Sequence, residues 1–237
     1  MTVGIVGAGR MGCAIARAVA ASGEPVLLAR SRPGGGVRGG PLPVDCQQVS
    51  LAEVWRRAST VLVALPFPGA LELMSGPAGA VGAGRTLIDV TNPAFTNTTL
   101  PPGRSGGELI AEAASSWQVA KAFNTVPATQ FAACRLRGEP VTVPVAGGWS
   151  AKVVAFPLAR RLGFAPVDAG QIDASRELES LDALLARISD TNGLHGRIAI
   201  HIGQPEPPAG QRAAAARSGV ATGRGPAGGR LAGQLPR

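Results

Sequence analysis

The 237-residue chain has no tyrosine, three cysteines and two histidines. The cysteines, Cys13, Cys46 and Cys134, are scattered and no pair has the spacing of metal ligands, which favours free thiols in a reducing cytoplasm. Because His195 and His201 are the only imidazoles, neither a histidine metal site nor a Ser-His-Asp triad is expected. The sequence therefore predicts chemistry that uses no metal and no histidine base.

Long apolar runs are also missing. The sequence contains no stretch of about 18 apolar residues, the length that a membrane-spanning helix needs. The first apolar segment is interrupted by glycines and arginines, unlike the core of a signal peptide. We expect cytoplasmic localisation and no membrane partner.

The net charge of +8 raises the question of nucleic-acid binding. Half of that excess comes from the tail over residues 203–237, which holds five arginines and one glutamate, and no basic helix carries interleaved aromatics. We expect no nucleic-acid partner. The tail is rich in Gly, Pro, Ala and Arg and predicts disorder, with ordering in an oligomer or on an acidic partner as the alternative.

What the chain does have is a glycine motif at its start. The apolar run 2–6 predicts a buried strand, Cys13–Ala21 predicts a helix, and 25–29 predicts a second strand, with Gly7-Ala8-Gly9-Arg10-Met11-Gly12 after the first strand. A strand-turn-helix unit is the context in which such glycines bind a dinucleotide. The first glycine allows the turn, the second a close approach of pyrophosphate and the third tight packing of helix on strand.

The end of the second predicted strand indicates which dinucleotide is bound. NAD sites usually carry an acidic residue there, which accepts hydrogen bonds from the ribose 2′-hydroxyl. This chain has Arg30, Ser31 and Arg32 and no acid, a set that suits a 2′-phosphate. The sequence therefore predicts NADP(H); the alternative is that both arginines only face solvent.

The remaining pattern alternates strands and helices. It predicts an α/β, Rossmann-type, doubly wound and mostly parallel sheet in one compact domain over 1–200. A short third strand is expected at Leu42-Pro43-Val44, and two capping-box helices begin after Ser50 and Ser105. Strands are also expected over 60–65, 86–90, 118–123, 141–145 and 165–170, and helices over 70–74, 151–162 and 175–189.

Residues at strand ends are the functional candidates, because ligands bind at the carboxyl edge of such sheets. The expected cofactor-binding residues are Gly7, Ala8, Gly9, Arg10, Met11, Gly12, Arg30, Ser31, Arg32, Leu65, Pro66, Asn92, Asn124, Ala146 and Gly147. For a proton donor, Lys121, Asn124, Thr125 and Ser150 are the candidates near the site.

These motifs resemble the NADPH-dependent reductases of the 8-hydroxy-5-deazaflavin coenzyme, coenzyme F-420. The resemblance runs from residue 3 to about 200, through the glycine turn and the stretches 31–32, 65–66, 89–93, 119–127 and 145–147. Its most specific part is Asp168-Ala169-Gly170 followed by 175–181.

The resemblance implies hydride transfer between NADPH and the deazaflavin, stacked face to face at the carboxyl edge of the sheet. The cofactors then carry the chemistry, and the protein supplies proximity and orientation. The resemblance implies that residues 8–11 hold the pyrophosphate, Ser31 and Arg32 the 2′-phosphate, and Leu65 and Pro66 the nicotinamide. It further implies that Asn124, Thr125 and Gly147 lie near the deazaflavin, and that the protein is a homodimer.

Three departures from the family pattern keep other functions open. Ala8 replaces the usual Gly or Thr, Gly148-Trp149-Ser150 replaces acidic residues expected near the acceptor pocket, and 192–237 replaces a short C-terminus. One alternative is therefore an NADPH-dependent reductase of a small carbonyl or imine compound in a biosynthetic pathway. The other is a non-catalytic, NADPH-binding regulatory protein.

Overall fold

The computed structural model describes residues 1–31, 40–96 and 98–203. Residues Met1–His201 form one compact unit. The expectations for Arg32 and for the tail beyond residue 203 fall outside the described residues.

An eight-stranded sheet forms the centre of this unit, in the order β10-β9-β6-β5-β4-β1-β2-β3. Strands β1 (Val3–Val6), β2 (Val26–Ala29), β3 (Cys46–Val49), β4 (Thr60–Val63), β5 (Thr86–Asp89) and β6 (Gln118–Lys121) are mutually parallel. Most of these strands are buried along their whole length, as the continuous apolar runs in the sequence predict. The Rossmann-type α/β fold expected from the sequence is confirmed.

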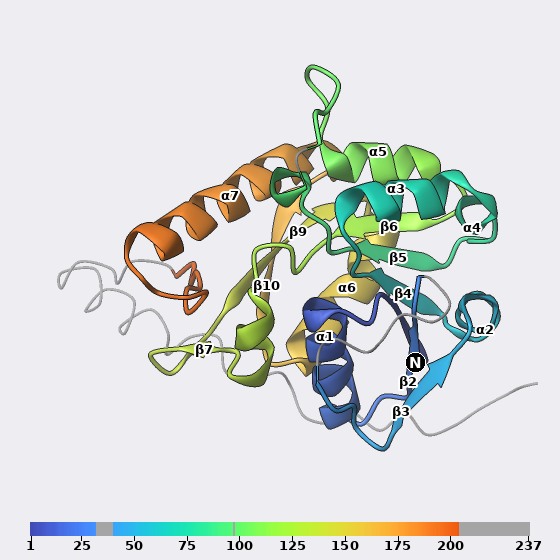
Figure 1. Cartoon of the computed structure of the whole chain (residues 1–237), viewed down its shortest axis with the longest axis horizontal. Coiled ribbons are helices and arrows are strands. Elements are labelled where there is room, and N and C mark those ends of the chain that lie inside the picture. The colour runs from blue at the N-terminus through green and yellow to red at the C-terminus, as the bar shows by residue number, and fades with distance from the viewer. Residues whose placement is uncertain (32–39, 97, 204–237) are drawn as a thin grey trace, which may run out of the picture. The chain divides into compact units, whose positions relative to one another are not determined.

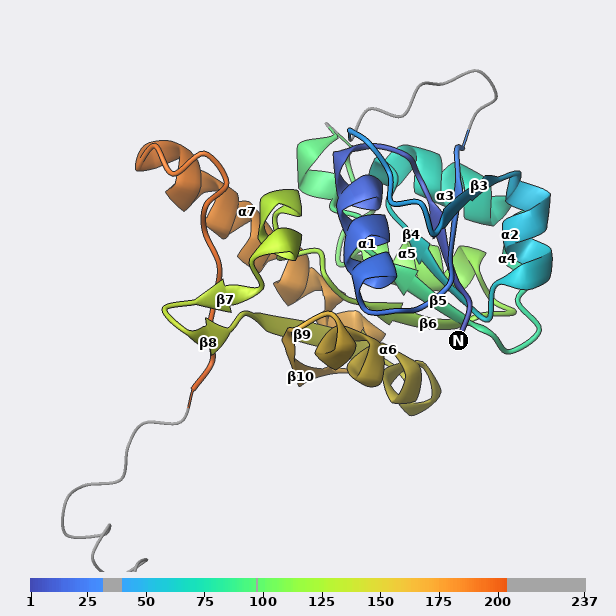
Figure 2. The same ribbon diagram turned by 90° about the horizontal axis from the view of Figure 1, so that it is seen from below.

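Helices cover both faces of the sheet (Figures 1 and 2). One apolar core packs α1 (Arg10–Ala21), α6 (Trp149–Arg161) and the 3-10 turn η2 (Ala128–Ala132) against one face. A second core packs α2 (Leu51–Arg57), α3 (Phe67–Ser75), α4 (Pro77–Ala80) and α5 (Gly106–Ala113) against the other. Both predicted capping boxes are present, with Ser50 and Glu53 at α2 and Ser105 and Glu108 at α5.

The third strand lies four residues later than predicted. Residues 42–44 are not a strand, because Pro43 has no N–H to donate and its carbonyl oxygen instead accepts from the Cys46 N–H at 3.0 Å, which closes a turn. The strand β3 then pairs with β2 from Cys46 onward. The sequence patterns do not predict α4, η2 or the short hairpin of β7 (Arg135–Leu136) and β8 (Glu139–Pro140), all of which the structure contains.

The last two strands of the sheet run in the opposite direction. Strand β9 (Thr142–Gly147) is antiparallel to β6, with Ala146 opposite Lys121 and Gly147 opposite Ala120, and β10 (Ala165–Gly170) is parallel to β9. The end of β9 therefore points away from the edge at which β1, β4, β5 and β6 end. The register nevertheless sets Ala146 opposite Lys121, the last residue of β6, so Ala146 is level with the ends of the parallel strands, and the chain leaves that edge from Gly147 onward.

The long helix α7 (Ser175–Thr191) follows the short 3-10 turn η3 (Ile172–Ala174), packs beside α5 and projects beyond the sheet (Figures 1 and 2). Its predicted apolar stripe is only partly buried: Leu178 and Leu185 are buried, whereas Leu184 and Ile188 are 53% and 39% exposed. The exposed part of the stripe therefore lies in the second half of α7.

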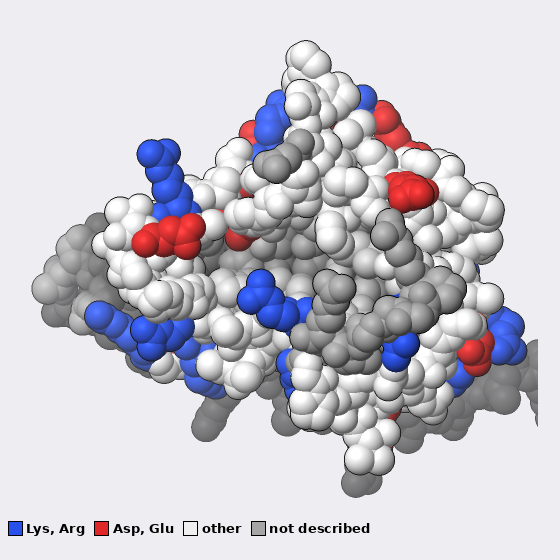
Figure 3. Space-filling view, in the orientation of Figure 1, with Lys and Arg blue, Asp and Glu red and all other residues white. Residues whose placement is uncertain are grey.

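On the face drawn in Figure 3, the described Lys and Arg side chains form separate groups, one of them near the middle of the view, and most of the surface between the charged groups is uncharged. Among the described residues, no helix is long and apolar enough to cross a membrane.

Candidate functional site

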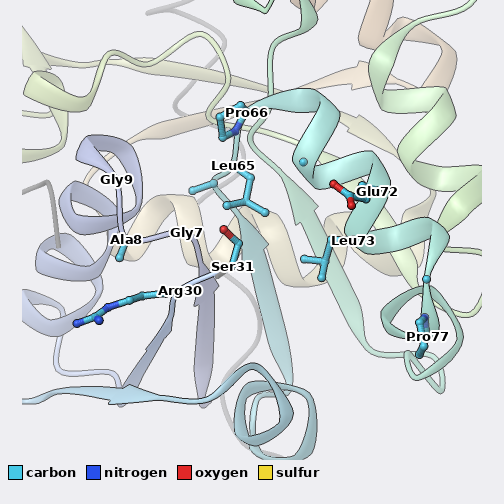
Figure 4. Close-up of a pocket in the computed structure, with 13 residues that line it drawn as sticks. Gly7, Ala8, Gly9, Arg30, Ser31, Leu65, Pro66, Glu72, Leu73 and Pro77 are labelled. Carbon is cyan, nitrogen blue, oxygen red and sulfur yellow. The ribbon is translucent and has the colours of Figure 1, made fainter. Parts of the chain in front are cut away.

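A cleft of about 790 Å³ opens at the edge where the parallel strands end. Figure 4 shows its walls: the glycine turn after β1, the end of β2, the end of β4 and the facing side of α3. Seven residues predicted from the sequence line it, namely Gly7, Ala8, Gly9, Arg30, Ser31, Leu65 and Pro66.

The glycine turn has the geometry that the motif requires. Gly7 has φ +120°, and a Cβ there would lie 2.3 Å from the Ala64 carbonyl oxygen. A Cβ on Gly12 would lie 1.7 Å from the Gly7 carbonyl oxygen, so helix α1 can approach the turn only with glycine at this position. At Gly9, by contrast, a Cβ would meet no described atom within 4 Å. The backbone at Gly9 is therefore open to the cleft.

The N-terminus of α1 is suited to an anion. Its N-cap is Gly9, no side chain of the described residues caps it, and its first turn contains no acidic residue. Unpaired N–H groups and the positive end of the helix dipole then face the turn. Arg10, Met11 and Gly12 form this first turn rather than the wall of the cleft.

The end of β2 places a cation and a hydroxyl on the cleft. Arg30 and Ser31 are exposed and line it, and the Arg30 guanidinium Nη2 donates to Gln48 Oε1 at 3.1 Å. Figure 4 shows the Ser31 hydroxyl near the Leu65 side, with the Arg30 side chain extending away from it. No acid follows β2 among the residues described there, as the sequence predicts for NADP(H).

The opposite wall of the cleft was missed by sequence reasoning. It consists of residues on α3 and at the start of α4: Gly69, Glu72, Leu73, Gly76 and Pro77. The sequence predicts a helix only from residue 70, whereas α3 begins at Phe67 because Pro68 is tolerated in the first turn of a helix. Extending the helix back to Pro66 would have placed this face beside the strand end.

Beyond the cleft, Lys121 is fully buried in an ion cluster. Its ammonium Nζ donates to Asp89 Oδ2 at 2.8 Å, Glu179 Oε1 at 2.9 Å and the Thr91 carbonyl oxygen at 2.9 Å. Burial by itself would lower the pKa of Lys121, but Asp89 and Glu179 raise it above its ordinary value. With all three N–H groups engaged, Lys121 holds α7 to the sheet and has no proton to offer a substrate.

Asn92 and Asn124 form a second polar group at the ends of β5 and β6. Asn92 Nδ2 donates to the Asn124 carbonyl oxygen at 2.9 Å, and Asn124 Nδ2 donates to Asn92 Oδ1 at 3.1 Å and to the Leu178 carbonyl oxygen at 3.0 Å. Neither asparagine lines the cleft; Asn92 follows β5, which is next to β4, and Asn124 follows β6, the strand beyond β5. We call these two residues the asparagine pair.

An aspartate on α7 contacts the asparagine pair and was not predicted. Asn92 Nδ2 also donates to Asp182 Oδ2, at 2.6 Å. Burial raises the pKa of Asp182 to about 7, against a lowering by the Lys121 ammonium. The spacing of Glu179 and Asp182, three residues apart and so on one helical face, is the signal that could have found it.

Several buried polar atoms near the asparagine pair lack a partner. Thr91 Oγ1, Asn124 Oδ1 and Thr125 Oγ1 make no hydrogen bond to any part of the chain that the structure describes. Such atoms are rare in folded proteins and often mark a functional region. Thr125 is, however, only 2% exposed, so its hydroxyl is not at the surface.

The remaining predicted residues lie elsewhere. Ala146 and Gly147 are buried within the sheet, and a Cβ on Gly147 would lie 2.7 Å from the Val119 carbonyl oxygen. Trp149 and Ser150 begin α6, and Trp149 is 72% exposed. Because β9 runs against β6, this segment begins at the opposite edge of the sheet from the cleft.

The glycine turn and the first strands match a known family. Residues 2–93 match the family model described as NADP oxidoreductase, coenzyme F420-dependent. A solved structure from Arthrobacter sp. FB24, named as a candidate F420-dependent NADP-reductase, is 25% identical, with a TM-score of 0.72 over 81% of this chain and 95% of that one. The resemblance indicated by the motifs is confirmed, and it supports an NADP-dependent oxidoreductase.

Two further proteins are similar over most of this chain. The metalloreductase STEAP3 of Rattus norvegicus is 27% identical over 179 residues, 76% of this chain, and this chain spans about a third of its length, 36%. A reductive aminase from Aspergillus terreus, solved with NADPH, is 15% identical, with a TM-score of 0.60 over 81% of this chain and 62% of that one. At this identity the second comparison shows the shared fold alone.

Proposed function

From the family match over residues 2–93, we propose that the chain binds NADPH in the cleft and transfers hydride between it and an 8-hydroxy-5-deazaflavin coenzyme. The observation that carries the nucleotide part is the open approach at Gly9, beside an uncapped helix N-terminus and an acid-free end of β2. The deazaflavin part rests on the family's description and on the sequence motifs.

The residues of the cleft suit each part of the nucleotide. The backbone N–H groups from Ala8 to Met11 would bind the pyrophosphate, and Arg30 with Ser31 would bind the 2′-phosphate. Leu65 and Pro66, at the end of β4, would lie against the nicotinamide. Arg32 is proposed from the sequence as a further phosphate contact.

Bound NADPH supplies a hydride, and the chain's own residues supply its placement. The rigid strand ends hold Leu65 and Pro66 in fixed positions, and apolar side chains on this wall exclude water from one side of the ring. Orientation of two reactants in this way accounts for a large share of rate enhancement in bimolecular reactions.

The experiment that tests this function mixes the purified protein with NADPH and the oxidised deazaflavin coenzyme. We expect rapid loss of the deazaflavin's visible absorbance, much slower with NADH. Nicotinamide fluorescence measures NADPH binding in the same samples. Binding of NADPH without any bleaching would contradict the deazaflavin acceptor and keep the nucleotide assignment.

A second candidate function is favoured by the asparagine pair and Asp182. A small carbonyl or imine substrate needs hydrogen-bond donors and an acid near its heteroatom, and this polar group lies at the ends of β5 and β6, the two strands that follow β4 in the sheet. We propose this reaction as the alternative. NADPH oxidation with a cyclic imine or a small ketone, in the absence of deazaflavin, would support it.

A further inference from the structure

We propose that Asp182 donates the proton that accompanies hydride transfer to the second substrate. The inference rests on the proposed function, because it takes the acceptor to bind beside the asparagine pair. The sequence predicts Lys121, Asn124, Thr125 and Ser150 as candidate proton donors, and Asp182 is not among them.

The position of the asparagine pair places Asp182 on the acceptor side of the cleft. A dinucleotide on such a sheet crosses the strand ends from β2 through β1 toward β4. The cleft wall ends at Leu65 and Pro66 after β4, and Asn92 and Asn124 follow β5 and β6, the next two strands. A substrate that meets the nicotinamide beyond Pro66 therefore faces the asparagine pair and the α7 carboxyl bonded to it.

The hydrogen bonds fix where Asp182 can carry its proton. Asn92 Nδ2 uses its two N–H groups on the Asn124 carbonyl oxygen and on Asp182 Oδ2. Oδ2 is thus an acceptor in this contact, and because the carbonyl-type oxygen of a neutral carboxyl is the better acceptor, the proton is placed on Oδ1. Within the described part of the chain, Oδ1 has no hydrogen-bond partner, so this atom remains available to a ligand.

The surroundings favour a neutral carboxyl. Burial disfavours the charged form, and the nearest cation, Lys121, is already paired with Asp89 and Glu179. Two carboxylates against one ammonium leave this cluster with an excess of negative charge, which gives little support to a third. Another cation of α7, Arg176, lies at the start of the helix and pairs with Glu108, which also pairs with Arg104.

The other candidates are less suitable as acids. The Lys121 ammonium is saturated, and Thr125 is nearly inaccessible. Ser150 lies on α6 at the opposite edge of the sheet, and the Asn124 amide is not an acid near neutral pH. Asp182 alone among them combines partial exposure with a titratable proton.

The reaction balances with this assignment. NADPH gives a hydride to an electrophilic carbon of the acceptor, forming a C–H bond and breaking the adjacent π bond to carbon, nitrogen or oxygen. The electron pair of that bond moves to the conjugated heteroatom, which takes the proton from Asp182 Oδ1. NADP⁺ and the reduced, protonated acceptor leave, and the Asp182 carboxylate regains a proton from water.

The test compares the wild type with Asp182→Asn, an isosteric change that can still accept the bond from Asn92. Turnover with NADPH and the oxidised deazaflavin coenzyme, or with a cyclic imine, is measured across pH. We expect kcat to fall about 100-fold in Asp182→Asn, a size typical of general acids. The wild-type rate should fall as pH rises through about 7, and this inflection should be absent in the variant.

A matched control and a readout without turnover complete the design. Asp190→Asn removes an exposed carboxylate from the same helix and should keep the wild-type rate and pH profile. Carbon-13 NMR of labelled aspartates, with and without Asp182→Asn, measures the titration of the Asp182 carboxyl itself in the NADP⁺ complex. A midpoint near neutral pH supports the proposal, and a midpoint in the ordinary range of aspartate overturns it.

The outcomes separate this inference from the proposed function. Wild-type turnover that Asp182→Asn leaves unchanged, with the same pH profile, overturns the role of Asp182 and keeps the function. Absence of turnover in the wild type, with NADPH bound, counts against the function, and the carboxyl titration then decides whether Asp182 holds a proton.

Discussion

Residues that look alike in the sequence have different tasks in the glycine turn. Gly12 is required by packing, since a Cβ there would overlap the Gly7 carbonyl oxygen, whereas the same change at Gly9 meets open space. We expect Gly12→Ala to lower the melting temperature strongly. Gly9→Val should keep the wild-type melting temperature and abolish NADPH binding, because its side chain would occupy the approach of the pyrophosphate. Calorimetry and nicotinamide fluorescence distinguish the two, and retained NADPH affinity in Gly9→Val would make the turn purely structural.

A substitution of Arg30 tests whether the site prefers NADPH to NADH. Removing a charge-assisted contact to the 2′-phosphate costs about 1.5 kcal/mol or more, about tenfold in affinity. Arg30→Ala should weaken NADPH binding by about this factor and leave NADH binding unchanged. Arg56→Ala, which removes an exposed arginine from α2, is the control. Equal losses for both nucleotides would contradict a role in binding the 2′-phosphate.

The sequence identified these residues because each obeys a local rule. A glycine motif after a strand, an end of β2 without acid and two capping boxes depend on neighbours within a few positions. Asp182 depends on contacts between segments about 90 residues apart along the chain. Local spacing places Asp182 on one helical face with Glu179, but its contact with Asn92 became visible only when α7 was placed against the ends of β5 and β6.

At the level of elements, the buried ion cluster fastens α7 to the sheet. Lys121 lies on β6, Asp89 on β5, and Glu179 on α7, where it also accepts the N–H groups of Gly106 and Gly107 at the start of α5. We expect Lys121→Met to destabilise the protein by about 3–5 kcal/mol, because it leaves two carboxylates buried without a cation. Urea unfolding measures this, and a loss below about 1 kcal/mol would mean that the cluster relaxes into water.

At the level of elements, local sequence patterns predicted where most strands lie but not the direction in which β9 and β10 run. The apolar run before Gly147 predicts a strand, and it is one, but a run of apolar residues reads the same in either direction. Only the hairpin of β7 and β8 before it and the pairing with β6 reverse the chain. The register of β9 therefore moved Trp149 and Ser150 from the expected acceptor pocket to the other edge of the sheet.

For the molecule as a whole, Asp182 predicts a pH dependence of stability. Its pKa is raised to about 7 in the folded protein from an ordinary value of 3.8. Between these values the folded state binds more protons than the unfolded state, so the free energy of unfolding falls as pH rises through this window. Asp182→Asn should remove this part of the slope, as urea unfolding at several pH values would show. If the free energy of unfolding depends on pH in the same way in both proteins, the raised pKa of Asp182 is contradicted.

The two halves of the proposed site come from distant parts of the chain. Every residue that lines the cleft precedes residue 78, whereas α7, which contributes Asp182, begins only at Ser175. During synthesis on the ribosome, the nucleotide half emerges first and the acceptor half roughly a hundred residues later. Evolution can likewise alter α7 and so exchange one acceptor for another, while the coenzyme that donates the electrons stays the same.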